Sequence, residues 1–477
     1  MRNAVACAAA GALLAACAVG PDYQRPKIES PGDWRIDYPK AAEVANTKWW
    51  EQFGDPALNQ IVDESLRGNL DVQAAASRVD QFLGALTTTR SQFFPQFGYA
   101  GEASRNRAST VGPTAIPPGV DPTYSVYQAN LNASWQIDLF GRVRRQSENV
   151  QAQVYASEQG RRGVILSVVA LAAASYVGLR ALDRELEIAR ATAQNYSGTR
   201  ELFQLRLQGG VISDVEMGQI ESQYQQAQAA IPALEQSIAA QENLISVLLG
   251  RSPGPVPRGK TIDELAPPAI PAGLPAELLE RRPDILQAEQ NLVAANAQIG
   301  AAKALYFPQF SLTGATGSVS TAFANFLTGP ARAWSLALGL AGPLFTFGAI
   351  SGQVRSAEAG KEEAMLFYQQ TILNALRETN DALTGSVKTR EVFEAQTKRV
   401  VALRNYARLS RLRFENGAAS YVEVLVAEND LFAAELNSVS TQADRFTQII
   451  NVYKAMGGGW IELGDAIANP PKETAKK

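Results

Sequence analysis

The sequence predicts a mainly α-helical protein with a small membrane β-sheet, built from two copies of one structural unit. Three features lead to this fold class: an internal duplication, four segments with period-2 hydrophobicity, and two very long stretches without proline. Period-2 patterning is typical of strands with one apolar face, and long proline-free stretches are typical of coiled-coil helices. We expect each copy to contain a first helix (about 56–92 and 276–304), two strands, a long helix and a final helix, which gives four strands per chain.

The duplication is visible as two motifs that recur in the same order. Phe94-Pro95-Gln96-Phe97 returns 213 residues later as Phe307-Pro308-Gln309-Phe310, and Leu205-Arg206 returns 207 residues later as Leu412-Arg413. Two co-linear matches of this kind indicate a repeat rather than chance.

The repeat divides the chain into parts. We place the first copy at 56–250 and the second at 276–460, with a C-terminal tail at 461–477. Residues 251–275 contain seven prolines, and this density excludes a long helix or a central strand. We therefore predict a linker between the copies.

The period-2 segments predict strands with two different faces. In Tyr127–Leu139, aromatic and aliphatic residues alternate strictly with Gln, Asn, Ser and Asp, and Trp334–Leu340 shows a similar alternation. The partners at 96–107 and 309–321 alternate more weakly. These lengths suit tilted strands of a membrane barrel, although a soluble sandwich would have the same pattern.

Four strands cannot close a barrel in lipid, where an open sheet edge is not tolerated. Chains must therefore pool their strands. Two chains would form a filled eight-stranded barrel, and three would form twelve strands around a possible aqueous lumen. Small residues on one face of the last strand favour three.

The helical stretches at 143–207 and 350–414 would each extend ~98 Å at 1.5 Å per residue. Between Phe432 and Tyr453, apolar residues follow the 4-3 spacing of a coiled-coil seam. Pro232 is expected to kink its helix. The uncharged run Val164–Leu179 could be a membrane helix, but its length and its alanines favour close packing in a bundle.

The N-terminus resembles a lipoprotein signal. A short basic start and an Ala-rich run predict a signal peptide at 1–16, since the run is too short to cross a bilayer. Leu14-Ala15-Ala16-Cys17 resembles a lipobox, which implies cleavage before Cys17 and its acylation, palmitate included. An ordinary cleavage site is the alternative. Ala18 after the cysteine implies sorting to the outer membrane.

The composition excludes several function classes. The chain of 477 residues has no histidine, and its only cysteines are Cys7 and Cys17. His-based catalysis, imidazole ligands and most thiolate chemistry are therefore excluded. The charge is near balance, with 44 basic and 47 acidic residues, which does not favour a nucleic-acid partner. An enzyme that uses a carboxylate, serine or lysine would still be compatible with this composition. We expect instead a protein that acts through its shape, with no cofactor and no metal.

With these features the chain resembles the bacterial outer membrane factor family, the TolC-type efflux ducts, and within it the NodT-type efflux lipoproteins. The motifs that carry the resemblance, besides the paired Phe-Pro-Gln-Phe boxes, are Gly20-Pro21-Asp22-Tyr23, Trp49-Trp50 with Phe53, Asp55-Pro56-Ala57-Leu58, Asn69-Leu70-Asp71 and Arg281-Arg282-Pro283-Asp284.

The resemblance implies a homotrimer with a twelve-stranded outer-membrane barrel and a periplasmic tunnel of coiled-coil helices. The lipidated segment 17–55 and the linker 251–275, with the tail, would form an equatorial region. The implied function is the passive exit duct of a tripartite efflux system for small toxic compounds. Its partners would be a periplasmic adaptor, an inner-membrane pump and outer membrane lipid. The alternatives are the outer-membrane component of a type I protein secretion system and a lipid-tethered coiled-coil structural protein.

The resemblance also implies a periplasmic gate where the helices converge. The matching residues are Val422, Glu423 and Val426 in the second copy and Asp214 and Glu216 in the first. An alternative for the two acidic residues of the first copy is that they occupy a first helical turn capped by Ser213, where negative charge is favourable.

The turns between the paired helices match the tips that face the adaptor in that family. The candidate contact residues are Gly210, Val211, Ser213, Gly417, Ala418 and Ser420. Glycine is also the residue that any helix C-terminus prefers, so a purely structural role is the alternative.

Overall fold

The computed structural model describes residues 18–26, 48–111, 117, 119–270 and 278–457. The chain divides into two compact units. We call the first the sheet unit, which lies within residues 1–27, 79–157 and 288–368, and the second the bundle unit, which lies within 28–78, 158–287 and 369–477. The signal peptide 1–16, Cys17 and the tail 461–477 lie outside the described residues.

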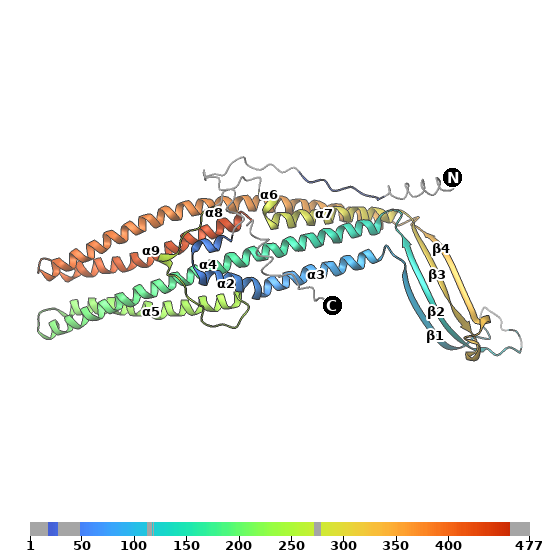
Figure 1. Cartoon of the computed structure of the whole chain (residues 1–477), viewed down its shortest axis with the longest axis horizontal. Helices are drawn as coiled ribbons and strands as arrows, with labels where there is room; N and C mark the ends of the chain where they lie inside the picture. The colour runs from blue at the N-terminus through green and yellow to red at the C-terminus, as the bar shows by residue number, and fades with distance from the viewer. Residues whose placement is uncertain (1–17, 27–47, 112–116, 118, 271–277, 458–477) are drawn as a thin grey trace. The chain divides into compact units, whose positions relative to one another are not determined.

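The helices and strands follow the order predicted for two copies (Figure 1). The α-helices and strands are α2 (Pro56–Gly68), α3 (Leu70–Ser91), β1 (Gln96–Arg107), β2 (Thr123–Ile137), α4 (Arg142–Gln208), α5 (Asp214–Leu248), α6 (Leu278–Arg281), α7 (Pro283–Lys303), β3 (Gln309–Ser320), β4 (Arg332–Ala341), α8 (Ala349–Glu415) and α9 (Tyr421–Ala455). Short 3-10 helices include η2 (Trp49–Phe53) and η3 (Ile262–Glu264). The long helices α4 and α8 have 67 residues each, and α5 and α9 have 35 each.

The first helix of each copy differs from the expectation. The single helix expected at 56–92 is broken at Asn69, whose ψ of 127° is extended. The Asn69 side chain accepts hydrogen bonds from the N–H groups of Asp71 and Val72, at 2.9 and 3.2 Å, and so caps α3. The helix expected at 276–304 is likewise divided, because Pro283 begins α7 after α6 has ended.

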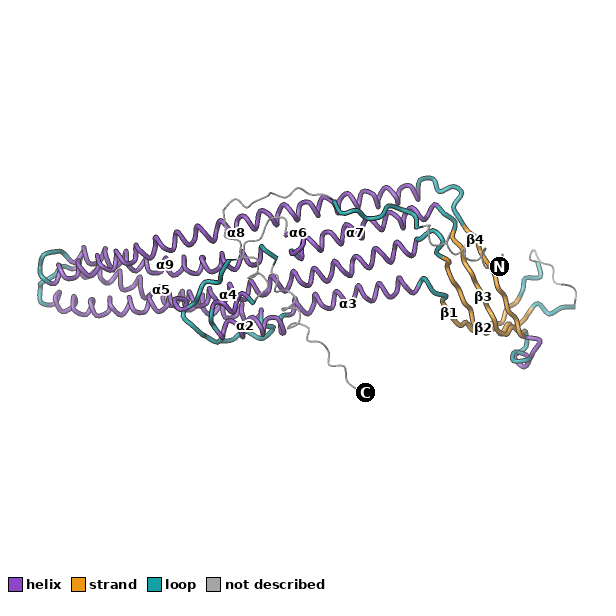
Figure 2. The backbone as a smooth tube through the Cα atoms, turned by 45° about the horizontal axis from the view of Figure 1, so that its top comes forward, coloured by secondary structure: helices purple, strands orange, loops and turns teal. Residues whose placement is uncertain are grey.

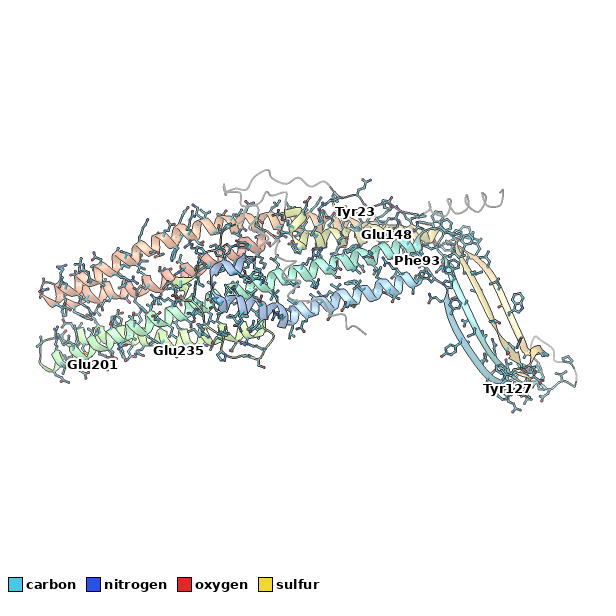
Figure 3. The ribbon with its side chains drawn as sticks, in the orientation of Figure 1. Tyr23, Phe93, Tyr127, Glu148, Glu201 and Glu235 are labelled. Atoms are coloured by element: carbon cyan, nitrogen blue, oxygen red, sulfur yellow. The ribbon has the colours of Figure 1, made fainter. Side chains whose placement is uncertain are left out.

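The four strands form one antiparallel sheet in the order β1-β2-β3-β4 (Figure 2). β2 begins four residues before the start of the expected segment Tyr127–Leu139, and it ends two residues before the end of that segment. At the end of β2 near its helix, the Trp135 indole donates to the Phe93 carbonyl at 2.9 Å. Phe93 lies where the helices meet the strands, and Tyr127 lies near the far end of the strands (Figure 3).

The core of the bundle unit contains the predicted coiled-coil seam. Phe432, Val439, Phe446, Ile450 and Tyr453 are buried in one apolar cluster. The apolar part of α4 is long enough to cross a membrane, but 72% of that window is buried in the structure, which is typical of a core helix. α5 continues through Pro232 as one helix.

Short segments far apart in sequence pack onto this core. The Trp49 ring stacks on Tyr453 at a centroid distance of 5.0 Å, and Phe53 packs on Phe446 at 5.5 Å. Within the predicted linker, Val256 and Ile262 are buried in the same cluster. The described part of the linker, 251–270, therefore packs in the bundle core rather than forming a free connection.

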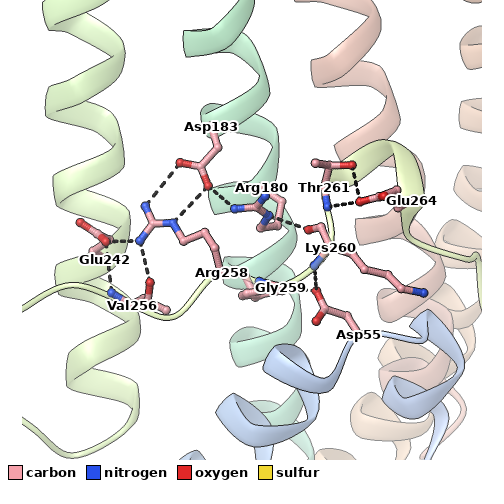
Figure 4. A network of polar contacts seen from close by, with 11 residues as sticks. Asp55, Arg180, Asp183, Glu242, Val256, Arg258, Gly259, Lys260, Thr261 and Glu264 are labelled. Atoms are coloured by element: carbon pink, nitrogen blue, oxygen red, sulfur yellow. Dashed lines mark hydrogen bonds and ion pairs between the residues drawn. The ribbon is translucent and has the colours of Figure 1, made fainter.

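Asp55 is the polar centre of this packing (Figure 4). Its buried carboxylate accepts hydrogen bonds from Ala57 N–H at 2.9 Å, Lys260 N–H at 3.0 Å and Tyr176 Oη at 2.6 Å. One carboxylate thus caps α2 and ties it to α4 and to the linker. Burial, together with the hydrogen bond to Asp55, raises the pKa of the Tyr176 phenol above its usual range.

The Arg281-Arg282-Pro283-Asp284 motif has a similar role at the second copy. The buried Arg282 guanidinium binds both Asp284 carboxylate oxygens, at 3.0 and 2.6 Å, and Glu378 at 2.9 Å. It also donates to the Ala455 carbonyl at 3.0 Å. The contact joins the start of α7 to α8 and to the C-terminus of α9.

Candidate functional site

The sheet has one apolar and one polar face. Strand register places Tyr99, Leu131, Thr316 and Trp334 in one row across β1 to β4. Facing residues in adjacent strands lie on the same side, and successive residues alternate between sides. The next row, shifted by one residue, therefore lies on the opposite side.

The rows sort side chains by chemistry. Most of the larger apolar side chains share one face: Phe97, Tyr99, Leu131, Trp135, Ile137, Phe310, Leu312, Trp334, Leu336, Leu338 and Leu340. The other face carries polar side chains: Gln96, Glu102, Gln128, Asn130, Asn132, Ser134, Gln136, Ser311, Thr313 and Ser335.

Among the residues that the structure describes, none covers the apolar face. Tyr99, Leu131, Trp334 and Leu336 are all exposed. A contiguous apolar face of this extent marks contact with a membrane or another chain rather than with water. The strands have 12, 15, 12 and 10 residues, which is sufficient to span a bilayer when tilted.

The two helix turns of the bundle unit have the same backbone structure. Gly210 and Gly417 adopt φ values of +68° and +70°. The N–H of Val211 donates to the Arg206 carbonyl at 2.9 Å, and that of Ala418 donates to the Arg413 carbonyl at 2.8 Å. This is the Schellman arrangement, in which a left-handed glycine ends the helix.

The side chains at the two turns differ. Ser213 and Glu216 form a reciprocal capping box at the start of α5, with Glu216 accepting from Ser213 N–H at 2.8 Å. That backbone hydrogen bond lowers the pKa of the Glu216 carboxyl. In the second copy Ser420 makes no side-chain cap, and Glu423 instead pairs with Arg413 at 2.8 Å. The capping alternative for Glu216 thus has its geometry in the structure.

The candidate gate valines lie on an open surface. Val422 and Val426 are one turn apart on α9, and both are about half exposed. With Val215 and Leu425 they line a groove of about 450 Å³ between α5 and α9, which also contains Asp430. The structure places Asp214 at the first position of α5, next to this surface.

An aromatic cluster behind the turns joins α4 to α8 and α9. Phe203 packs on Tyr421 at 4.2 Å and Phe414 packs on Tyr421 at 5.0 Å between ring centroids. The Arg206 guanidinium lies over Phe203 and Phe414, at 5.8 and 5.5 Å. The helix pairs are therefore held together by aromatic packing and cation–π contacts.

Glu428 is a buried acid that the sequence reasoning did not select. It pairs with Arg411 at 2.5 Å, and burial raises the pKa of its carboxyl while Arg411 partly opposes that shift. The signal was available, because Glu428 lies seven residues after Tyr421 and four before Phe432. It thus lies on the same helix face as these two buried aromatic residues, where a charge is unusual.

Loss of the cap at the first turn should loosen α5 locally. We expect Ser213→Ala to cost about 1 kcal/mol, which corresponds to roughly fivefold faster amide exchange at the α5 N-terminus. Hydrogen–deuterium exchange of this segment measures the effect.

Ser420→Ala is the matched control, since its hydroxyl makes no cap, and it should leave exchange at the start of α9 unchanged. Equal effects at the two serines would contradict the asymmetry of the turns.

The chain matches known proteins over nearly its whole length. The model of the outer membrane efflux protein family covers residues 61–251 and 274–458. The chain is 32% identical over 461 residues to the solvent efflux pump outer membrane protein SrpC of Pseudomonas putida, spanning 94% of this chain and 96% of that protein. It is 29% identical over 456 residues to the probable outer membrane lipoprotein SilC of Salmonella typhimurium, spanning 94% and 97% of the two.

Among solved structures, the open state of the Neisseria gonorrhoeae MtrE outer membrane channel matches with a TM-score of 0.84 at 27% identity, covering 93% of this chain and 99% of that one. The predicted duplicated helical fold with four strands per chain is confirmed, as is the predicted outer-membrane location. The chain belongs to the outer membrane efflux protein family.

Proposed function

We propose that three copies of this chain form a twelve-stranded barrel in the outer membrane and act as the exit duct of a tripartite efflux pump. The observation that carries the proposal is the four-stranded sheet, with one exposed apolar face and one polar face. Lipid would cover the first face and water the second, as in a membrane barrel.

The number of copies follows from closure. Each unpaired backbone group in lipid costs several kcal/mol, so two open edges would exceed the about 5–15 kcal/mol that stabilises a typical protein. Eight strands leave an interior filled by side chains, whereas twelve leave room for water. Small inward residues such as Ala333 and Gly339 favour the wider barrel.

The duct is a passive conduit. A periplasmic adaptor and an inner-membrane pump would supply the connection and the energy, and the adaptor would contact the two Gly turns. The relative SrpC is named as part of a solvent efflux pump, which supports small toxic compounds as the exported class. The N-terminal segment, the packed linker and the C-terminal tail would form the equatorial region.

Deleting the gene should lower resistance to organic solvents and hydrophobic drugs, because the pump loses its exit. Susceptibility assays with and without a plasmid copy measure this effect. The profile of secreted proteins should stay unchanged. Loss of a secreted protein with unaltered resistance would instead indicate type I secretion.

In this proposal the barrel attaches the protein to the outer membrane, and acylation of Cys17 adds a second attachment. The detergent-extracted protein should have about three times the mature chain mass, both as the natural chain and as Cys17→Ser, because pooled strands hold it in the bilayer. Light scattering with mass spectrometry of the N-terminus measures mass and lipid together.

A Cys17→Ser protein that is monomeric and soluble without detergent would contradict the barrel. It would support a lipid-tethered helical protein.

The gate is proposed at the exposed surface of Val422 and Val426, with Glu423 and the acidic residues of the first copy beside it. Val422→Ala combined with Val426→Ala should widen the constriction and raise single-channel conductance in planar bilayers. Val392→Ala combined with Val401→Ala is the control, because these valines of α8 are similarly exposed and the same atoms are removed. Equal conductance in both variants would place the constriction elsewhere.

A further inference from the structure

The two copies of the duplicated unit repeat individual contacts as well as elements. In the first copy Tyr99 faces Leu131. Adding 213 to the first number and 207 to the second gives Leu312 and Leu338, which face each other in the second copy. Offsets found in the sequence therefore convert a contact of one copy into the corresponding contact of the other.

The same correspondence holds where strands meet helices. Phe94 N–H donates to the Ser91 carbonyl at 3.1 Å, and its counterpart Phe307 N–H donates to the Ala304 carbonyl at 3.2 Å. Phe140 and its counterpart Phe347 are each followed by a glycine with positive φ, 76° and 93°. Phe94 is thus equivalent to Phe307, and Phe140 to Phe347.

One of these aromatic pairs joins the two copies within the chain. The Phe140 ring stacks on Phe307 at a centroid distance of 4.6 Å and an interplanar angle of 22°. The equivalent pair is Phe347 and Phe94, but these two rings are not stacked within the chain. Phe347 is 100% exposed and Phe94 is 67% exposed. Phe347 also has a φ of 46°, a strained conformation that non-glycine residues keep only where surrounding contacts hold it.

The outer edges of β1 and β4 also correspond to a pairing that exists inside the chain. β2 pairs with β3, which joins the two copies, whereas β1 and β4 are each paired on one side within the described sheet. Ile137 faces Phe310, and the shifted equivalents are Leu344 and Phe97, both strongly exposed. Leu131 faces Thr316, and the shifted equivalents are Leu338 and Ala103.

We propose that β4 of one chain pairs antiparallel with β1 of a neighbouring copy, with Trp334–Ala341 beside Ala100–Arg107 and Leu338 facing Ala103. The ring of Phe347 then stacks on Phe94 of the neighbouring copy. The inference rests on the proposed barrel and goes beyond it by assigning the register and the aromatic contact of the subunit junction.

The register agrees with the chemistry of both strands. Leu338 and Ala103 lie on the apolar face of their own chains, so the junction continues that face from one copy to the next. A slip of one residue would exchange the apolar and polar faces of the neighbouring sheet. The register also brings Arg107 of the neighbouring copy opposite Trp334, near the loop end of the strands, where an arginine can lie over an indole ring.

Disulfide cross-linking in membranes tests the register. Paired strand residues have Cα atoms about 4.5–5.5 Å apart, within the range of a disulfide. We expect Leu338→Cys with Ala103→Cys to give covalently linked dimers and trimers on mild oxidation. Leu338→Cys with Gly101→Cys is the matched control, shifted by two residues on the same face, and should cross-link far less.

The outcomes separate the inference from the proposed function. Efficient cross-linking of the shifted pair would overturn the register, as would a detergent-stable trimer in which neither pair cross-links. Absence of any trimer would instead overturn the barrel on which the inference rests.

A mutant cycle tests the aromatic contact without cross-links. Phe347→Ala and Phe94→Ala should each speed dissociation of the detergent-solubilised trimer, and the double variant should dissociate no faster than the worse single variant. Coupling of a stacked pair corresponds to roughly 2- to 12-fold in the dissociation rate. Effects that multiply independently would show that the two rings do not touch.

Discussion

The constraint on which the structure depends is a four-stranded sheet that cannot be completed by one chain. Its apolar face needs lipid, its polar face needs water, and the outer edges of β1 and β4 need partners. Unpaired backbone groups are too costly to leave in a bilayer, which is why we propose that copies of the chain pool their strands. In the proposed barrel, oligomerisation is a consequence of backbone hydrogen bonding, and the channel follows from the polar face that the barrel would enclose.

Internal duplication supplies most of what the assembly needs. Because the two copies share their strand register and their helix turns, the junction between copies inside the chain shows how two chains can meet. The register β1–β2 recurs as β3–β4, and Schellman turns end α4 and α8 alike. At the two helix turns the copies differ in their side chains. The capping box of Ser213 and Glu216 has no equivalent at Ser420, where Glu423 binds Arg413. Such differences allow one backbone to provide turns of unequal stability.

The bundle unit shows how a long helical protein is held together by a few buried polar groups. Asp55 and Arg282 each join three segments distant in sequence, and both come from motifs that the sequence comparison with the family selected. The physical reason is that a buried charge must have all its hydrogen bonds satisfied, so it specifies the placement of each partner. Apolar packing of Trp49 and Phe53 on α9 stabilises the same part of the bundle.

The sequence alone was sufficient for features set by local periodicity. Alternation in Tyr127–Leu139 and the 4-3 spacing of Phe432–Tyr453 report the faces of a strand and a helix directly, and the repeat offsets define the two copies. Tertiary structure decided what depends on distant partners. The break at Asn69 requires the Leu248 carbonyl, to which its side-chain amide donates at 2.9 Å, and the packing of the linker requires the core that it covers. The pairing of Glu423 with Arg413, the cap at Ser213 and the burial of Glu428 likewise depend on side-chain geometry, because one residue type can serve as a cap, an ion pair or a gate according to its neighbours in space.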